Sequence, residues 1–136
     1  MFKSEGKLIY SDLPKDDLSQ FRLVVEIDPE IARYYRSLIP KSISVSVPLY
    51  APHISVVRKE IPTNIDVWKK YNDEIVEFEY DPYIFFGQIY CWLNVYCIRL
   101  EDIREELGLT RISDITCPPD KRPVFHTTIG NQKNKK

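Results

Sequence analysis

Short apolar segments with the composition of β-strands recur along most of this chain and limit it to folds in which strands are the main element. The candidate strands are residues 21–27, 42–47, 53–58, 74–80, 83–97 and 124–129. Residues 42–47 (SISVSV) alternate strictly, which predicts a half-buried strand or an extended arm. Residues 74–80 mix apolar residues with glutamates, as expected of a strand with one face in water. Gly87 divides residues 83–97, which therefore form either two strands or one bent strand.

Three further segments have the signals of helices. Asp28 is a suitable N-cap for a helix over residues 29–38, because a proline follows it at the first helical position. Residues 63–71 can form a short capped helix. Residues 99–107 have an apolar stripe at helical spacing, and Gly108 is placed to end that helix.

Helices and strands are interspersed, and the strands have the pattern of half-exposed ones. This pattern favours an α+β fold over a doubly wound parallel sheet. A length of 136 residues suits one domain. We therefore expect a single domain over residues 1–131, followed by a flexible basic tail over residues 132–136.

Composition excludes several classes of protein. The formal net charge is −1, so no general attraction to nucleic acid is expected, and local groups must hold any anionic ligand. No apolar run approaches the roughly 20 residues that span a membrane, and residues 1–10 are too charged for a signal peptide. Three cysteines without a CxxC pair are expected to be reduced thiols. We therefore expect a cytoplasmic protein with no metal, no cofactor and no membrane partner.

The chain contains two histidines, and each lies in a similar strand-like motif. His53 is followed two positions later by Ser55, and His126 is followed in the same way by Thr128. Residues i and i+2 of a strand point to the same face, so each strand presents an imidazole and a hydroxyl together. If the two strands are neighbours, all four groups converge on one place.

Such a group of side chains suits the chemistry of a phosphodiester. One neutral imidazole can accept a proton from an attacking oxygen, and one imidazolium can donate a proton to the leaving oxygen. The two hydroxyls can hydrogen-bond the non-bridging oxygens. A single histidine in a strand is more often a packed or surface residue than a catalyst. The repeated motif, in a chain with no other histidine, favours the catalytic interpretation.

The two motifs resemble those of the 2H phosphoesterase superfamily, whose hallmark is two copies of His, an apolar residue, Ser or Thr, and an apolar residue. The second copy reads HTTIGN from His126, and the first lies within APHISVVRKE, residues 51–60. The intervening segment ends in YCWLNVYC and a helix, which is similar to small phage-type members, such as anti-CBASS nucleases that destroy cyclic-dinucleotide signals.

The resemblance implies a bilobal fold, in which two antiparallel sheets flank a central cleft and the helices lie outside. It also implies action on 2′,3′-cyclic phosphates, 2′–5′ linkages or cyclic oligonucleotides. Carried over to this sequence, it makes His53 and His126 the acid and base, and Ser55 and Thr128 the phosphate ligands. A viral member would act in the cytoplasm of its host.

Four other residues are weaker candidates for substrate contacts. Arg58 is either a phosphate ligand or a solvated charge at the rim, and its odd offset from His53 places it on the opposite strand face unless a bulge intervenes. Tyr50 either covers the mouth of the pocket or packs as a plug. Tyr90 and Trp92 share one strand face, where they either stack on a nucleobase or form an amphipathic wall.

These observations predict a metal-independent phosphodiesterase whose partner is a cyclic nucleotide, a cyclic oligonucleotide or an RNA end. Small size slightly favours a cyclic-dinucleotide nuclease over a 2′,3′-cyclic phosphodiesterase of RNA end repair. A non-catalytic nucleotide-binding module is the alternative from another class. In a structural protein with an accidental match, His53 and His126 would lie far apart.

Overall fold

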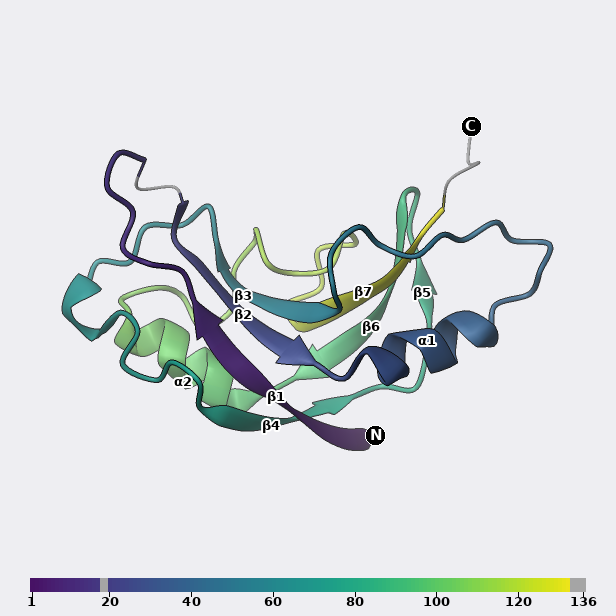
Figure 1. The fold of residues 1–136 in the computed structure, drawn as a ribbon, viewed down its shortest axis with the longest axis horizontal. Helices are drawn as coiled ribbons and strands as arrows, with labels where there is room; N and C mark the ends of the chain where they lie inside the picture. Colours follow the sequence, from purple (N-terminus) through teal and green to yellow (C-terminus); the bar gives the residue numbers. More distant parts are fainter. Residues whose placement is uncertain (18–19, 133–136) are drawn as a thin grey trace.

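The computed structural model describes residues 1–17 and 20–132. Its strands are β1 (Phe2–Tyr10), β2 (Arg22–Ile27), β3 (His53–Arg58), β4 (Ile75–Tyr80), β5 (Phe85–Phe86), β6 (Tyr90–Tyr96) and β7 (Phe125–Asn131). Its helices are α1 (Pro29–Ser37), α2 (Ile98–Glu106) and the short 3-10 helix η2 (Ile65–Val67). Figure 1 shows α1 and α2 at opposite ends of the molecule, with β2, β3 and β7 between them.

The strands form one antiparallel sheet in the order β4-β1-β2-β3-β7-β6-β5, and a further pairing between β4 and β6 closes it into a six-stranded barrel. The short strand β5 pairs with β6 beside that closure. The predicted bilobal fold with two sheets is therefore wrong. Because the two motif strands, β3 and β7, pair directly with each other, no cleft divides one sheet from another.

Apolar side chains that alternate along the strands fill the inside of the barrel. Leu23 and Val25 of β2, Ile54 of β3 and Phe125 of β7 are at most 1% exposed and belong to the main core. Residues Leu100, Ile103 and Leu107 of the α2 region join this core. Helix α1 packs against a second cluster formed with β6 and β7. The interior is thus occupied by packed side chains, most of them apolar.

Both long helices lie where the sequence predicts them. The Asp28 side chain caps α1 by accepting a hydrogen bond from the Glu30 N–H, at 2.9 Å. Helix α2 begins at Ile98, one residue earlier than predicted, and Gly108 follows it with a φ of 82°. This left-handed conformation favours glycine, as expected of a helix end.

Three segments differ from the prediction. Strand β1 was not predicted, because charged residues dominate its outward face and hide the alternation. Residues 42–47 form no strand and are joined to β7 by an isolated bridge between Ser46 and Asn131. Helical structure in residues 63–71 is limited to η2.

The C-terminal prediction is only partly within the described residues. Residues 133–136 of the predicted tail lie outside them. Gln132 is bonded twice to the β5–β6 turn: its backbone N–H donates to the Ile89 carbonyl at 2.7 Å, and its side-chain amide donates to the Gly87 carbonyl at 2.9 Å. No helix in the described part of the chain is both long and apolar enough to cross a membrane.

Candidate active site

The two histidine motifs lie on neighbouring antiparallel strands, and their middle residues, Ile54 and Thr127, are directly opposite each other. Each histidine is consequently opposite the hydroxyl residue of the other motif. Facing residues in such a pair have Cβ atoms about 4.5–5.5 Å apart. The four predicted catalytic side chains thus form a compact group, with the imidazoles on one diagonal and the hydroxyls on the other. This group, the histidine rectangle, consists of His53, Ser55, His126 and Thr128.

The histidine rectangle lies on the outside of the barrel. Ile54 and Thr127, between the motif residues, are 0% and 1% exposed and point into the interior, so the four rectangle residues point outward. Each of the four is half-buried. The Ser55 and Thr128 hydroxyls have no hydrogen-bond partner within residues 1–17 and 20–132, so both are free to bind a ligand.

The two adjacent strands complete the surroundings of the rectangle. On β6, Asn94 and Trp92 lie opposite the histidine and threonine of the second motif. On β2, Glu26 and Val24 lie opposite the histidine and serine of the first motif. The four strands therefore carry two parallel rows of side chains on one face. The two inner strands, β3 and β7, contribute the imidazoles, and β2 and β6 contribute the outer members of each row.

Both imidazoles are oriented by backbone carbonyl groups. Nδ1 of His53 lies 2.9 Å from the Ala51 carbonyl oxygen, and Nδ1 of His126 lies 3.2 Å from that of Thr116. A carbonyl oxygen can only accept a hydrogen bond, so Nδ1 carries the hydrogen in each ring. The other nitrogen, Nε2, is then the atom of each histidine that is left to exchange a proton with a ligand.

The environment of His126 favours its neutral form. The pKa of this imidazole is lowered to about 4, chiefly by burial and in smaller part by the charges of His53 and Arg58. The hydrogen bond to Thr116 and the charge of Asp120 act in the opposite direction. At neutral pH His126 therefore has an unprotonated Nε2, as a general base requires.

A β-bulge determines the position of Arg58. Ser55 and Val57 both pair with β2, whereas Val56 between them has no partner there. Val56 and Val57 are both 0% exposed and point inward. The bulge therefore reverses the alternation, and Arg58 returns to the outward face that carries Ser55. The spacing in the sequence places Arg58 on the opposite face from His53 unless a bulge intervenes, and the structure contains such a bulge.

A fully buried arginine of α2 stabilises this bulge. Nη1 of Arg104 donates to the Val56 carbonyl at 2.7 Å, and both terminal nitrogens bind the Glu60 carboxylate at 2.9 and 2.8 Å. Nε donates to the Thr110 carbonyl at 2.6 Å. Because this arginine is 0% exposed, its contacts fix α2 to the segment that orients Arg58.

A pocket of about 530 Å³ borders the histidine rectangle on the side of β5 and β6. Phe85, Tyr90 and Trp92 form an aromatic wall, and Asp120 and Arg122 lie on the polar side. The guanidinium of Arg122 lies 3.9 Å from the centre of the Phe85 ring. Trp92 connects the pocket to the rectangle, because it lies opposite the threonine of the second motif.

The two predicted stacking residues differ in how accessible they are. Trp92 is 2% exposed, stacks on Phe85 at 6.0 Å between ring centres, and donates from Nε1 to the Asn94 side chain at 3.0 Å. Trp92 is therefore a packed residue in the wall of the pocket. Tyr90 is 44% exposed, which leaves its ring available to a ligand. Tyr50 lies in the loop before β3 and is 70% exposed, so it does not pack as a plug.

Several residues of the site had no signal of their own in the sequence. Asn94, Asp120 and Arg122 are ordinary polar residues there, and only the pairing of β6 with β7 and the return of the 109–123 loop bring them to His126 or its pocket. Asn94 is 2% exposed and shares the face of Trp92, which the spacing within residues 88–97 does predict.

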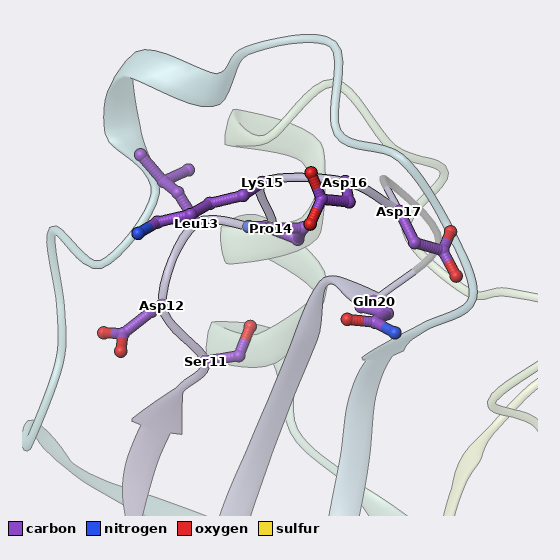
Figure 2. Close-up of a pocket in the computed structure, with 8 residues that line it drawn as sticks. All are labelled: Ser11, Asp12, Leu13, Pro14, Lys15, Asp16, Asp17 and Gln20. Carbon is purple, nitrogen blue, oxygen red and sulfur yellow. The ribbon is translucent and has the colours of Figure 1, made fainter.

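A second hollow, of about 420 Å³, lies in the loop between β1 and β2. Figure 2 shows that the carboxylates of Asp12, Asp16 and Asp17 point in different directions around it. Asp12 forms an ion pair with Lys69 at 2.6 Å. No residue predicted for the site lines this hollow, and its acidic groups do not converge on one point.

Within residues 1–17 and 20–132, no three His, Cys, Asp or Glu side chains are grouped so that they could hold a metal ion. The chain matches no protein-family model, no curated protein and no solved structure at a significant level. The interpretation of the site therefore depends on its geometry and on the two motifs.

Proposed function

We propose that this protein is a phosphodiesterase in which His126 is the general base and His53 the general acid. The observation that supports this proposal is the pairing of Ile54 with Thr127, which brings two imidazoles and two unpaired hydroxyls to one outward face. Accidental motifs on unrelated strands would not meet in this way.

The reaction follows from the protonation of the two rings. Nε2 of neutral His126 accepts the proton of the attacking hydroxyl, which is either the 2′-hydroxyl of the substrate or water. That oxygen forms a bond to phosphorus while the bond to the leaving oxygen breaks. Nε2–H of the His53 imidazolium donates its proton to the leaving oxygen. The two rings end with their protonation states exchanged, and proton exchange with solvent restores them.

The remaining groups of the site have roles that match their chemistry. The hydroxyls of Ser55 and Thr128 donate hydrogen bonds to the non-bridging oxygens of the phosphate. The pocket beside Tyr90 accommodates a nucleobase, which stacking stabilises by about 1–3 kcal/mol. A nucleotide fits these features better than a simple phosphate ester would.

The resemblance to the 2H phosphoesterases supports the same proposal through the motif residues alone. The closed barrel differs from the bilobal fold that the resemblance implies, so beyond the motif roles only the substrate classes of the family are carried over, as candidates to test. Within the proposed activity, cyclic dinucleotides and 2′,3′-cyclic phosphates at RNA ends are the two substrate classes to compare.

The test is to incubate the protein with cyclic dinucleotides and 2′,3′-cyclic nucleotides in the presence of EDTA and to identify the products by mass. We expect turnover, and we expect His53→Asn or His126→Asn to reduce kcat by about 100- to 10,000-fold each. Binding without turnover would indicate the nucleotide-binding module instead. Turnover that stops in EDTA and returns with added metal would contradict a mechanism based on the two histidines alone.

Two adjacent threonines provide a matched control. Thr128→Val removes an outward hydroxyl of the rectangle and is expected to reduce kcat by about 100-fold. Thr127→Val is the same chemical change at the next residue, where the hydroxyl points inward and is buried without a partner. This variant should retain the activity of the wild type. Equal losses in both variants would mean that the hydroxyl of Thr128 has no specific role.

A further inference from the structure

Two arginines lie side by side on the outward face of the barrel, next to the histidine rectangle. Arg22 of β2 is the direct partner of Arg58 of β3. The bulge at Val56 places Arg58 on the face of Ser55, and the pairing places Arg22 on that face too. The two Cβ atoms are then about 4.5–5.5 Å apart.

This arginine pair has no counter-ion among the residues that the structure describes. Both residues are exposed, and neither forms an ion pair with any residue of the described ranges 1–17 and 20–132. The acidic side chain of Asp12, in the nearby β1–β2 loop, is already paired with Lys69. Like charges directly opposite each other destabilise a sheet, and a bound anion would remove that repulsion.

The arginine pair lies within electrostatic reach of the reacting groups but does not overlap them. The charge of Arg58 acts on His126, which shows that the two are near each other. Along β3, Arg58 is the next outward residue after Ser55, and successive outward residues of a strand are about 7 Å apart. The side chains of Arg22 and Arg58 can therefore meet a group of the ligand well beyond the phosphate held by the histidine rectangle.

We propose that Arg22 and Arg58 together bind a second phosphate of the substrate, one nucleotide unit away from the phosphate that reacts. Paired guanidinium groups match the geometry and charge of a phosphodiester. The inference rests on the proposed function and narrows its substrate to a molecule with at least two phosphates. A cyclic dinucleotide and a linear dinucleotide that ends in a 2′,3′-cyclic phosphate both have two phosphates, whereas a 2′,3′-cyclic mononucleotide has one.

The first test compares three substrates: a cyclic dinucleotide, a linear dinucleotide ending in a 2′,3′-cyclic phosphate, and a 2′,3′-cyclic mononucleotide. We expect Arg22→Ala to raise KM for dinucleotides about 10-fold more than for the mononucleotide, because a charge-assisted contact is lost. Arg33→Ala, which removes an exposed positive charge from α1, should leave all three reactions unchanged. A loss confined to the cyclic dinucleotide assigns the second phosphate to a cyclic substrate, and a loss confined to the linear dinucleotide assigns it to a strand end. Equal losses for the two dinucleotides mean that the arginine pair accepts the second phosphate of either, and equal losses for all three substrates overturn the second phosphate site.

The second test measures binding without turnover. In the His53→Asn, His126→Asn double variant, the affinity for a cyclic dinucleotide is followed by tryptophan fluorescence. Adding Arg22→Ala should weaken the Kd about 10-fold. An unchanged Kd, or no binding at millimolar concentration, overturns the second phosphate site. Because this measurement needs no reaction, it separates failure of the arginine site from failure of the proposed activity.

Discussion

At the scale of single residues, the two histidines are distinguished by what surrounds them and not by how they are held. Each donates from Nδ1 to a backbone carbonyl, so each presents Nε2 to the ligand. His126, in addition, has a pKa lowered to about 4 by burial and by the positive charges near it. The proposed division of roles between base and acid thus follows from the desolvation of one ring.

The low pKa of His126 predicts how the stability of the protein depends on pH. An unfolded histidine titrates near ~6.5, so between that pH and about 4 the unfolded chain binds more protons than the folded protein. The stability associated with neutral His126 is present above about pH 6.5 and is lost as the pH falls towards 4.

This loss is measured by comparing the wild type with His126→Gln in urea unfolding at pH 7 and pH 4.5. The difference in free energy of unfolding between the two proteins should shift by about 2 kcal/mol against the wild type on acidification. His126→Asn checks that the shape of the replacement does not cause the shift. A constant difference across this pH range would show that His126 is not held in its neutral form.

At the scale of secondary structure, the bulge in β3 and its support by α2 connect the core to the face that carries the histidine rectangle. Arg104 is bonded to the carbonyl of the bulged residue, Val56, and to the carboxylate of Glu60. An arginine with no exposed surface is costly to bury unless its hydrogen bonds are satisfied. Here the main chain of the bulge and one carboxylate satisfy most of them.

Arg104→Met is predicted to destabilise the protein by about 3–5 kcal/mol, because Glu60 is left with a poorly solvated, unpaired charge. The midpoint of urea unfolding measures this effect. Arg99→Met is the control: its ion pair with Glu74 is partly exposed, and its loss should cost about 1 kcal/mol or less. Similar losses in both variants would contradict the structural role given to Arg104.

The sequence predicts the faces of the motif strands but not this bulge. Spacing of two residues places His53 with Ser55 and His126 with Thr128, and it separates Trp92 from the core residues of β6. The bulge has no such signal in the sequence. Val56 and Val57 are both apolar, and two consecutive apolar residues occur in ordinary buried strands as well as in a bulge. The position of Arg58 therefore became clear only from strand pairing.

At the scale of the whole molecule, some neighbouring strands of the barrel are paired over short stretches and others over long ones, and the shortest pairing is that of β3 with β7, through Ile54 and Thr127. Strand β4 joins β6 through two residue pairs, Glu79 with Tyr96 and Tyr80 with Val95. By contrast, β1 and β4 are paired over six positions, from Phe2 to Lys7. Closure of this kind depends on contacts between distant segments, which local patterns of apolar residues do not specify. The two-sheet prediction came instead from the resemblance of the two short motifs to the 2H phosphoesterases, and motifs of this length do not determine how the rest of the sheet closes.

Hydrogen exchange should reveal this difference in pairing. Amides that bond across the β4–β6 junction are expected to exchange faster than those between β1 and β4, because short junctions open locally at low free energy. Tyr96→Phe removes the hydrogen bond from the Tyr96 hydroxyl to Asp81 and should increase exchange at the junction further. Uniform protection around the barrel would mean that the junction opens only with global unfolding.

The filled interior of the barrel also has a consequence for evolution and engineering. Because the histidine rectangle projects from the outer wall, it shares no packing volume with the hydrophobic centre. Loops around that wall, such as residues 109–123 and the β5–β6 turn, can be lengthened or exchanged while the scaffold keeps its internal fit. A library of variants confined to those loops is therefore expected to change the ligand preference while leaving the barrel unchanged.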